Sequence, residues 1–78
     1  MTRQDFLDMH GSCVRALQTY FVEAEKTTLM LANFTGVPLS FTARFELMSQ
    51  EIVEKEAHTS YLRAKGTLYE ATRLGFEA

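Results

Sequence analysis

Several features that would narrow the function of a small protein are scarce in this sequence. Its 78 residues include no Trp, one Cys and one Pro, and 8 Lys and Arg stand against 10 Asp and Glu, for a net charge of -2. A single cysteine excludes an internal disulfide framework and a zinc site built from cysteines. The balanced charge lacks the basic surplus that is typical of nucleic-acid-binding proteins. We therefore expect no nucleic-acid partner.

Long hydrophobic runs are also missing. The longest uninterrupted apolar run is Leu29–Ala32, whereas a helix needs about 20 apolar residues to span a bilayer. Charged side chains interrupt residues 1–20, so no signal-peptide core is present there. A lone cysteine is consistent with a reducing compartment. These absences predict a soluble, cytoplasmic protein that does not enter a membrane.

The hydrophobic residues that are present make up 46% of the chain, which suits one folded domain over residues 1–78. Below about 70–80 residues, however, a single core rarely supplies more than about 3–5 kcal/mol. Chains of this size usually add a disulfide, a metal or a partner chain. Because the disulfide is excluded, the residue pattern has to decide between a metal and a partner.

Signals that stop and restart a helix cluster in residues 33–40. Gly36 can adopt the left-handed conformation that ends a helix, and Pro38 cannot continue one. Ser40 then offers a side-chain oxygen to the free N–H groups of a new helix. The order of these residues predicts a single turn between two helices.

The outer ends of the two helices carry matching signals. Thr2 and Asp5 have the spacing of a capping box at the start of the first helix. Gly75 suits the end of the second, where we expect Phe76 to fold back on Ala71. These residues set the outer limits of the helical region.

The fold class predicted from these signals is all-α, an antiparallel two-helix hairpin with helices at about 3–33 and about 41–74. The pair Gly11 and Ser12 leaves open whether the first helix is broken there. Glycine inside a helix costs about 1 kcal/mol relative to alanine, and Ser12 can cap a helix of its own.

Apolar residues of the first helix form a coiled-coil-like seam with steps of mostly three and four. The seam is Phe6, Met9, Cys13, Leu17, Tyr20, Ala24, Thr27, Leu31 and Phe34, and a second row beside it is Leu7, Val14, Phe21 and Thr28. The seam is expected to close the hairpin against one row of the second helix.

That row of the second helix is the one with the larger side chains. It consists of Phe41, Phe45, Met48, Ile52, Thr59, Leu62, Gly66 and Tyr69. In an antiparallel hairpin folded at the turn, residues whose numbers sum to about 75 lie opposite one another. This register pairs Leu31 with Phe45 and Cys13 with Leu62.

A further row of the second helix has no third helix to cover it. It consists of Val53, Ala57, Tyr61, Ala64, Leu68 and Ala71. An uncovered apolar patch usually marks an interface, and closed two-fold dimers are the commonest oligomers. We therefore predict that this row is an interface through which two hairpins form a four-helix bundle.

Two groups of side chains are candidates for a chemical site. Glu51, Glu54 and His58 share one helix face, but the Glu-x-x-His spacing of di-iron bundles is missing, so we expect a solvated face and no metal site. Cys13 with His10 suggests a thiol activated by an imidazole, but Cys13 lies in the seam and is expected to pack as a small hydrophobic residue.

Glu56 is an isolated acid that the predicted register places near Tyr20 along the hairpin. It is expected to hydrogen-bond the hydroxyl of Tyr20 or to extend into solvent, as part of ordinary surface charge. The sequence therefore predicts no catalytic residues and no cofactor.

The sequence favours a non-enzymatic helical-hairpin interaction module that self-associates, with a homodimer as the expected assembly. One alternative is a small adaptor or chaperone-like subunit that binds an amphipathic helix of another protein. A weaker third is a small bundle that binds a metal or ligand. The pathway, the partner and the oligomer number do not follow from the residues.

Overall fold

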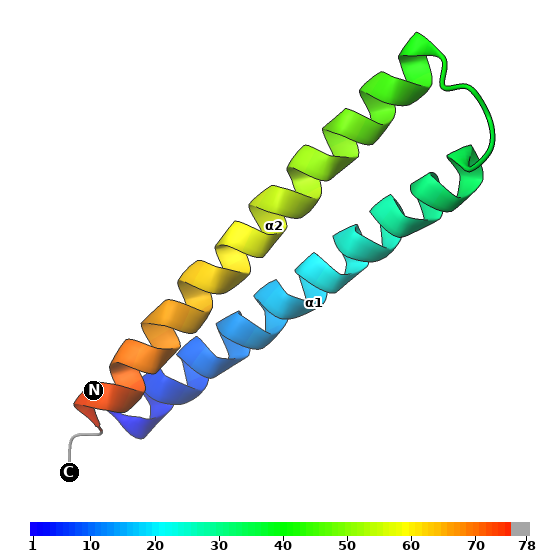
Figure 1. The fold of residues 1–78 in the computed structure, drawn as a ribbon. Helices are drawn as coiled ribbons and strands as arrows, with labels where there is room; N and C mark the ends of the chain where they lie inside the picture. The colour runs from blue at the N-terminus through cyan, green and yellow to red at the C-terminus, as the bar shows by residue number, and fades with distance from the viewer. Residues whose placement is uncertain (76–78) are drawn as a thin grey trace.

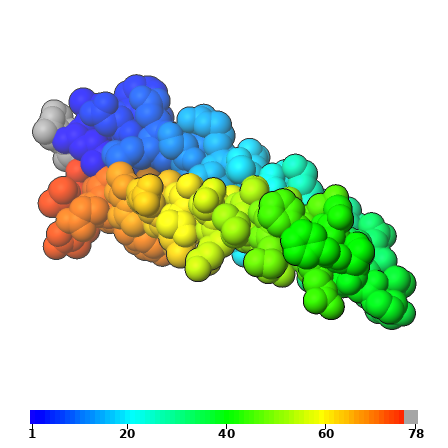
Figure 2. Space-filling model, turned by 90° about the horizontal axis from the view of Figure 1, so that it is seen from above, coloured from blue at the N-terminus to red at the C-terminus, as the bar shows by residue number. Residues whose placement is uncertain are grey.

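The computed structural model describes residues 1–75 of the chain. It consists of two helices, α1 (Arg3–Phe34) and α2 (Phe41–Leu74), which pack against each other as an antiparallel hairpin (Figure 1). The hairpin is about 61 Å long and 14 Å across. Both helices run its full length, side by side (Figure 2). The all-α hairpin predicted from the sequence is confirmed.

The helices begin where the capping residues predicted. The Thr2 hydroxyl accepts a hydrogen bond from the Asp5 N–H at 3.1 Å, and the Asp5 carboxylate accepts one from the Thr2 N–H at 3.2 Å. At the start of α2, the Ser40 hydroxyl accepts from the Ala43 N–H at 3.1 Å. Each cap satisfies backbone donors that the first turn of a helix leaves free.

The turn between the helices depends on a glycine conformation. Thr35 has φ -62° and ψ 127°, Gly36 has φ 75°, and the Val37 N–H donates to the Phe34 carbonyl at 3.3 Å. These angles are those of a type II turn, whose third residue needs positive φ. Gly36 therefore adopts the positive φ that was expected, within a β-turn that follows α1.

The distal end of α2 also closes on a glycine. Gly75 has φ 78°, and its N–H donates to the Ala71 carbonyl at 3.1 Å. The expected contact of Phe76 with Ala71 lies outside the described residues. At the other doubtful point, α1 continues through Gly11 and Ser12 without a break.

Each helix contributes one continuous row to the seam between them, with alternating steps of three and four residues. Every member is buried or half-buried. On α1 the row is Phe6, Met9, Cys13, Ala16, Tyr20, Glu23, Thr27, Met30 and Phe34. On α2 it is Ala43, Leu47, Gln50, Glu54, Ala57, Tyr61, Ala64, Leu68 and Ala71. This spacing is that of an antiparallel coiled coil.

The structure corrects the prediction of which α2 row closes the hairpin. The bulky row predicted to face α1 is exposed, with Ile52 at 57% and Leu62 at 50%. The row predicted to be uncovered lies along α1 instead, and Ala71 is only 4% exposed. Alanine at seam positions lets the two helix backbones approach closely, which large side chains would prevent. Large side chains of α2, such as Phe45 and Ile52, lie on its outer face instead.

The α1 seam needs a smaller correction. Leu31 is 49% exposed, and the half-buried Met30 takes its place in the seam. Leu17 and Ala24 remain half-buried at the edge of the seam. The expected register still holds approximately, because Glu23 contacts Gln50 and the ring of Tyr20 lies beside that of His58.

Candidate functional site

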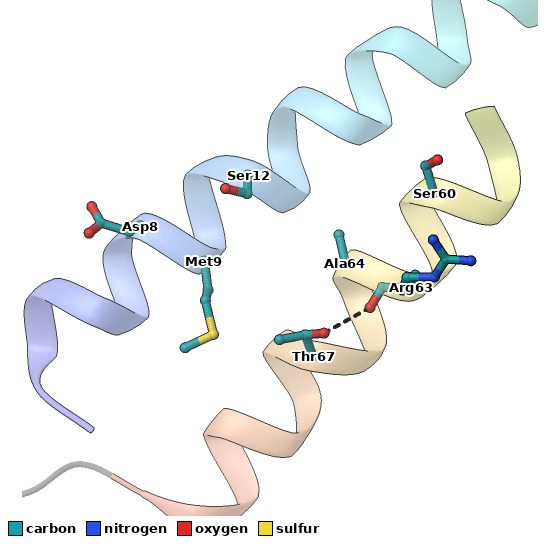
Figure 3. Close-up of a pocket in the computed structure, with 7 residues that line it drawn as sticks. All are labelled: Asp8, Met9, Ser12, Ser60, Arg63, Ala64 and Thr67. Carbon is teal, nitrogen blue, oxygen red and sulfur yellow. Dashed lines mark hydrogen bonds between the residues drawn. The ribbon is translucent and has the colours of Figure 1, made fainter. Parts of the chain in front are cut away.

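One side of the groove between the helices holds a cavity of about 410 Å³. Figure 3 shows Met9 and Ala64 directed into the space between α1 and α2, while Asp8 and Arg63 point away from it. The remaining lining residues are Ser12, Ser60 and Thr67.

Two of the three hydroxyls that line this cavity are engaged within their own helices. Ser12 accepts a hydrogen bond from the Arg15 guanidinium at 3.2 Å, and Thr67 donates to the Arg63 carbonyl at 3.1 Å (Figure 3). Neither His nor Cys lines the cavity. It therefore brings together no pairing of a nucleophile with a base that nucleophilic catalysis would use.

The opposite side of the groove holds a second cavity, of about 270 Å³, near the open end of the hairpin. It is lined by Phe6, Cys13, Tyr61, Lys65, Leu68, Tyr69 and Thr72. The Lys65 ammonium lies 6.0 Å from the ring centroid of Tyr61 and 5.7 Å from that of Tyr69. These distances are within reach of a cation–π interaction, which holds the lysine over an aromatic wall.

Cys13 is a packing residue of the seam, as expected. Its thiol is free and only 8% exposed, whereas His10 is exposed and does not line the same cavity. The sequence placed Leu62 opposite Cys13, but Leu62 is exposed, and Tyr61 and Leu68 share the cavity with the thiol instead. A buried thiol among such neighbours behaves as a small hydrophobic side chain.

The acidic residues considered as metal ligands lie on different surfaces. Glu54 is half-buried in the seam, which corrects its predicted place on the solvent face, while Glu51 and His58 are exposed. The His58 ring packs 4.7 Å from the Tyr20 ring, centroid to centroid. Within residues 1–75, no group of three or more His, Cys, Asp or Glu side chains is placed to hold a metal ion.

Glu56 is exposed and lies with Ile52 and Lys55 along a hollow on the outer face of α2. The side chain that meets the Tyr20 ring is that of His58. Of the two positions expected for Glu56, the structure shows the outward one.

A polar cluster interrupts the apolar seam in the half nearer the turn. The Gln50 side-chain amide donates to the Glu23 carboxylate at 2.9 Å and to the Glu23 carbonyl at 3.1 Å. Lys26 donates to the other carboxylate oxygen at 3.2 Å, and the buried Thr27 hydroxyl donates to the same carbonyl at 3.1 Å. The hydrogen bond from Gln50, followed by that from Lys26, lowers the pKa of Glu23.

Most large apolar side chains of residues 1–75 lie outside the seam, and many of them form two further rows with heptad-like spacing. The α1 outer row is Leu7, His10, Val14, Leu17, Phe21, Ala24, Thr28 and Leu31. The α2 outer row is Phe41, Phe45, Met48, Ile52, Lys55, Thr59, Leu62, Gly66 and Tyr69. Their aromatic members are strongly exposed, with Phe41 at 85% and Phe21 at 59%. These rows are the candidate functional surface.

The residues predicted to form the interface with another chain occupy the seam or its edge. Val53 is exposed, Ala57, Tyr61, Ala64 and Leu68 are half-buried, and Ala71 is buried. The sequence pattern contained Leu7, Val14, Phe21 and Thr28 of the α1 outer row, and all of the α2 outer row except Lys55. It did not show which α2 row faces α1.

Comparison with protein-family models, with curated proteins and with solved structures finds no significant match to this chain. Within residues 1–75, neither helix has an apolar stretch long enough to cross a bilayer.

Proposed function

We propose that this chain is a non-enzymatic interaction module that self-associates through one outer row of each copy into a four-helix bundle. The observation that carries the proposal is the distribution of apolar side chains. Among residues 1–75, the buried positions are Cys13, Thr27 and Ala71, whereas Leu7, Phe21 and Leu31 of the α1 outer row are exposed. Burying one such side chain is worth about 1.5–3 kcal/mol, which the separate hairpin does not gain.

Self-association is the way in which a short chain of this composition gains that energy. A hairpin in which only Cys13, Thr27 and Ala71 of residues 1–75 are buried has little core of its own, and such chains usually depend on a partner. Two-fold pairing of hairpins covers an apolar row from each copy at once. We place the module in the cytoplasm, since its free Cys13 suits a reducing compartment.

Sedimentation equilibrium of the purified chain at micromolar concentration tests the proposal. We expect a mass that corresponds to an assembly of copies, with circular dichroism showing a helical protein. A well-folded monomer at these concentrations would contradict self-association. It would favour the alternative, an adaptor whose outer row receives an amphipathic helix of another protein.

A further inference from the structure

The two outer rows differ in charge, and this difference indicates which of them a second copy can cover. The α1 outer row has no Asp, Glu, Lys or Arg from Leu7 to Leu31, and its one titratable side chain is His10. The α2 outer row has Lys55 in its middle, with Ile52 and Thr59 on either side.

Two-fold symmetry makes a helix row meet itself. In antiparallel pairing over the whole row, the residue at the middle of the row faces the same residue of the other copy. In parallel pairing, every residue faces the same residue of the other copy. Residue 55 is the midpoint between Phe41 and Tyr69, so parallel pairing and antiparallel pairing over the whole row both set the Lys55 ammonium against that of the other copy. Two like charges brought together out of water oppose association.

The α1 outer row has no such conflict. Its midpoint falls between Leu17 and Phe21, and antiparallel pairing about this point sets Leu17 opposite Phe21 and Leu7 opposite Leu31. It also sets His10 opposite Thr28, whereas parallel pairing would set each His10 against its copy. Antiparallel helices additionally align their macrodipoles favourably.

The position of the α1 outer row suits this role. Each of Leu7, Val14 and Phe21 follows a seam residue directly, so the row is rotated by about 100° from the seam. It lies across the helix from Asp8 and Ser12, which border the cavity of Figure 3. A helix whose two apolar rows are about a right angle apart can contact two neighbours at once, as in a four-helix bundle.

Resting on the self-association proposed above, we infer that a second copy of this chain docks with its α1 antiparallel to α1 of the first, along Leu7 to Leu31. The α2 outer rows then lie away from the contact between the copies, on the outside of the dimer.

The chain offers a matched pair of variants for the test, Phe21→Glu and Ile52→Glu. The two side chains are almost equally exposed in the hairpin, at 59% and 57%, so the substitutions cost the separate hairpin similar amounts. We expect Ile52→Glu to keep the wild-type mass in sedimentation. Phe21→Glu should weaken the assembly by about a hundredfold or more, since it places a carboxylate in an apolar contact.

Each outcome decides a different point. If Ile52→Glu dissociates the assembly and Phe21→Glu does not, the α1 contact is wrong while self-association stands. If the wild-type chain is itself a folded monomer, self-association is wrong. If both variants keep the wild-type mass, neither outer row is the contact and the inference is overturned.

Disulfide trapping tests the direction of pairing without a disruptive charge and covers the case in which Phe21→Glu fails to fold. In a Cys13→Ala background, Leu7→Cys and Leu31→Cys chains are mixed and oxidised. Antiparallel pairing predicts disulfides between the two different chains, because only facing positions come within bonding distance. Disulfides that join Leu7→Cys chains to each other and Leu31→Cys chains to each other would show parallel pairing, and the absence of any disulfide would contradict the α1 contact.

Discussion

The Gln50 side-chain amide donates hydrogen bonds to both the carbonyl and the carboxylate of Glu23, at 3.1 and 2.9 Å, and so joins α2 to α1 inside the seam. Both residues occupy positions of the heptad pattern where an apolar side chain is usual. A polar pair at such positions is tolerated when its members satisfy each other, and it favours one register over its neighbours. If α2 moved along α1 by one helical turn, the Gln50 amide and the Glu23 carboxylate would stay half-buried but could no longer bond to each other.

Replacing Gln50 should therefore destabilise the hairpin more than replacing an exposed glutamine does. Gln50→Ala removes the amide and leaves the Glu23 carboxylate without one of its donors, so we expect a clear fall in the free energy of unfolding. Gln18→Ala, on the exposed face of α1, makes the same change of side chain and should stay within about 0.5 kcal/mol of wild type. Urea unfolding followed by circular dichroism at one protein concentration measures both. Equal effects of the two substitutions would mean that the bond contributes nothing.

Acid should weaken the same link. Hydrogen bonds from Gln50 and Lys26 hold the pKa of Glu23 below its usual value of 4.5. Because the folded state holds the carboxylate at a lower pKa than the unfolded state, its contribution is complete above pH 4.5 and is lost as the pH falls through the folded pKa.

Glu23→Gln keeps an acceptor oxygen and removes the titration. We expect its free energy of unfolding to fall less than that of wild type between about pH 6 and about pH 3. Some dependence should remain, because hydrogen bonds from Thr2 also lower the pKa of Asp5. Glu25→Gln removes an exposed carboxyl from the same turn and serves as the control. A pH profile of Glu23→Gln that matches wild type would contradict the link.

The helix limits could be predicted from the sequence because their signals are local. Thr2 with Asp5, Ser40 and Gly36 each act within four residues of themselves. The structure shows the two caps as expected and Gly36 with the expected positive φ, in the turn after α1. Such interactions need no knowledge of what packs against the helix.

The face of α2 that meets α1 could not be predicted, because both candidate rows have heptad spacing. Gln50 and Glu54 interrupt the true seam with polar side chains, and its apolar members include small alanines, so by hydrophobicity it is the weaker row. The Gln50 amide donates to Glu23, which is distant in sequence. The spacing of apolar residues along one helix cannot predict a hydrogen bond to the other helix. The two outer rows can be identified as the exposed surface only once the seam is known.

Two glycines should respond to alanine with opposite signs. Gly36 has φ 75°, where a side chain is strained, so Gly36→Ala should cost about 1–2 kcal/mol. Gly66 lies within α2, with open space where a Cβ would be, so Gly66→Ala should stabilise the helix by up to about 1 kcal/mol. Thermal unfolding at one concentration compares them. Stabilisation by Gly36→Ala would show that the turn is not type II.

The start of α2 depends on one hydroxyl. Ser40→Ala removes the acceptor for the Ala43 N–H and should cost about 1 kcal/mol. Ser40→Asp supplies another acceptor at the same position and should restore the stability. Thr42→Ala, at an exposed position two residues further along, is the matched control and should change the stability little. Loss of stability in Ser40→Asp as large as in Ser40→Ala would mean that the cap is not the cause.

Lys55 should limit how far the module assembles. It interrupts the α2 outer row between Ile52 and Leu62, and we expect its charge to prevent these rows from pairing between dimers. Lys55→Leu makes the row apolar through its centre, so the variant should assemble beyond the dimer and do so more strongly as salt rises. Lys55→Arg keeps the charge and should retain the wild-type mass. Sedimentation velocity over a range of concentrations distinguishes the two variants. A Lys55→Leu chain that remains at the wild-type mass would show that the lysine does not control assembly, and the argument that excludes α2 from the contact between copies would lose its basis.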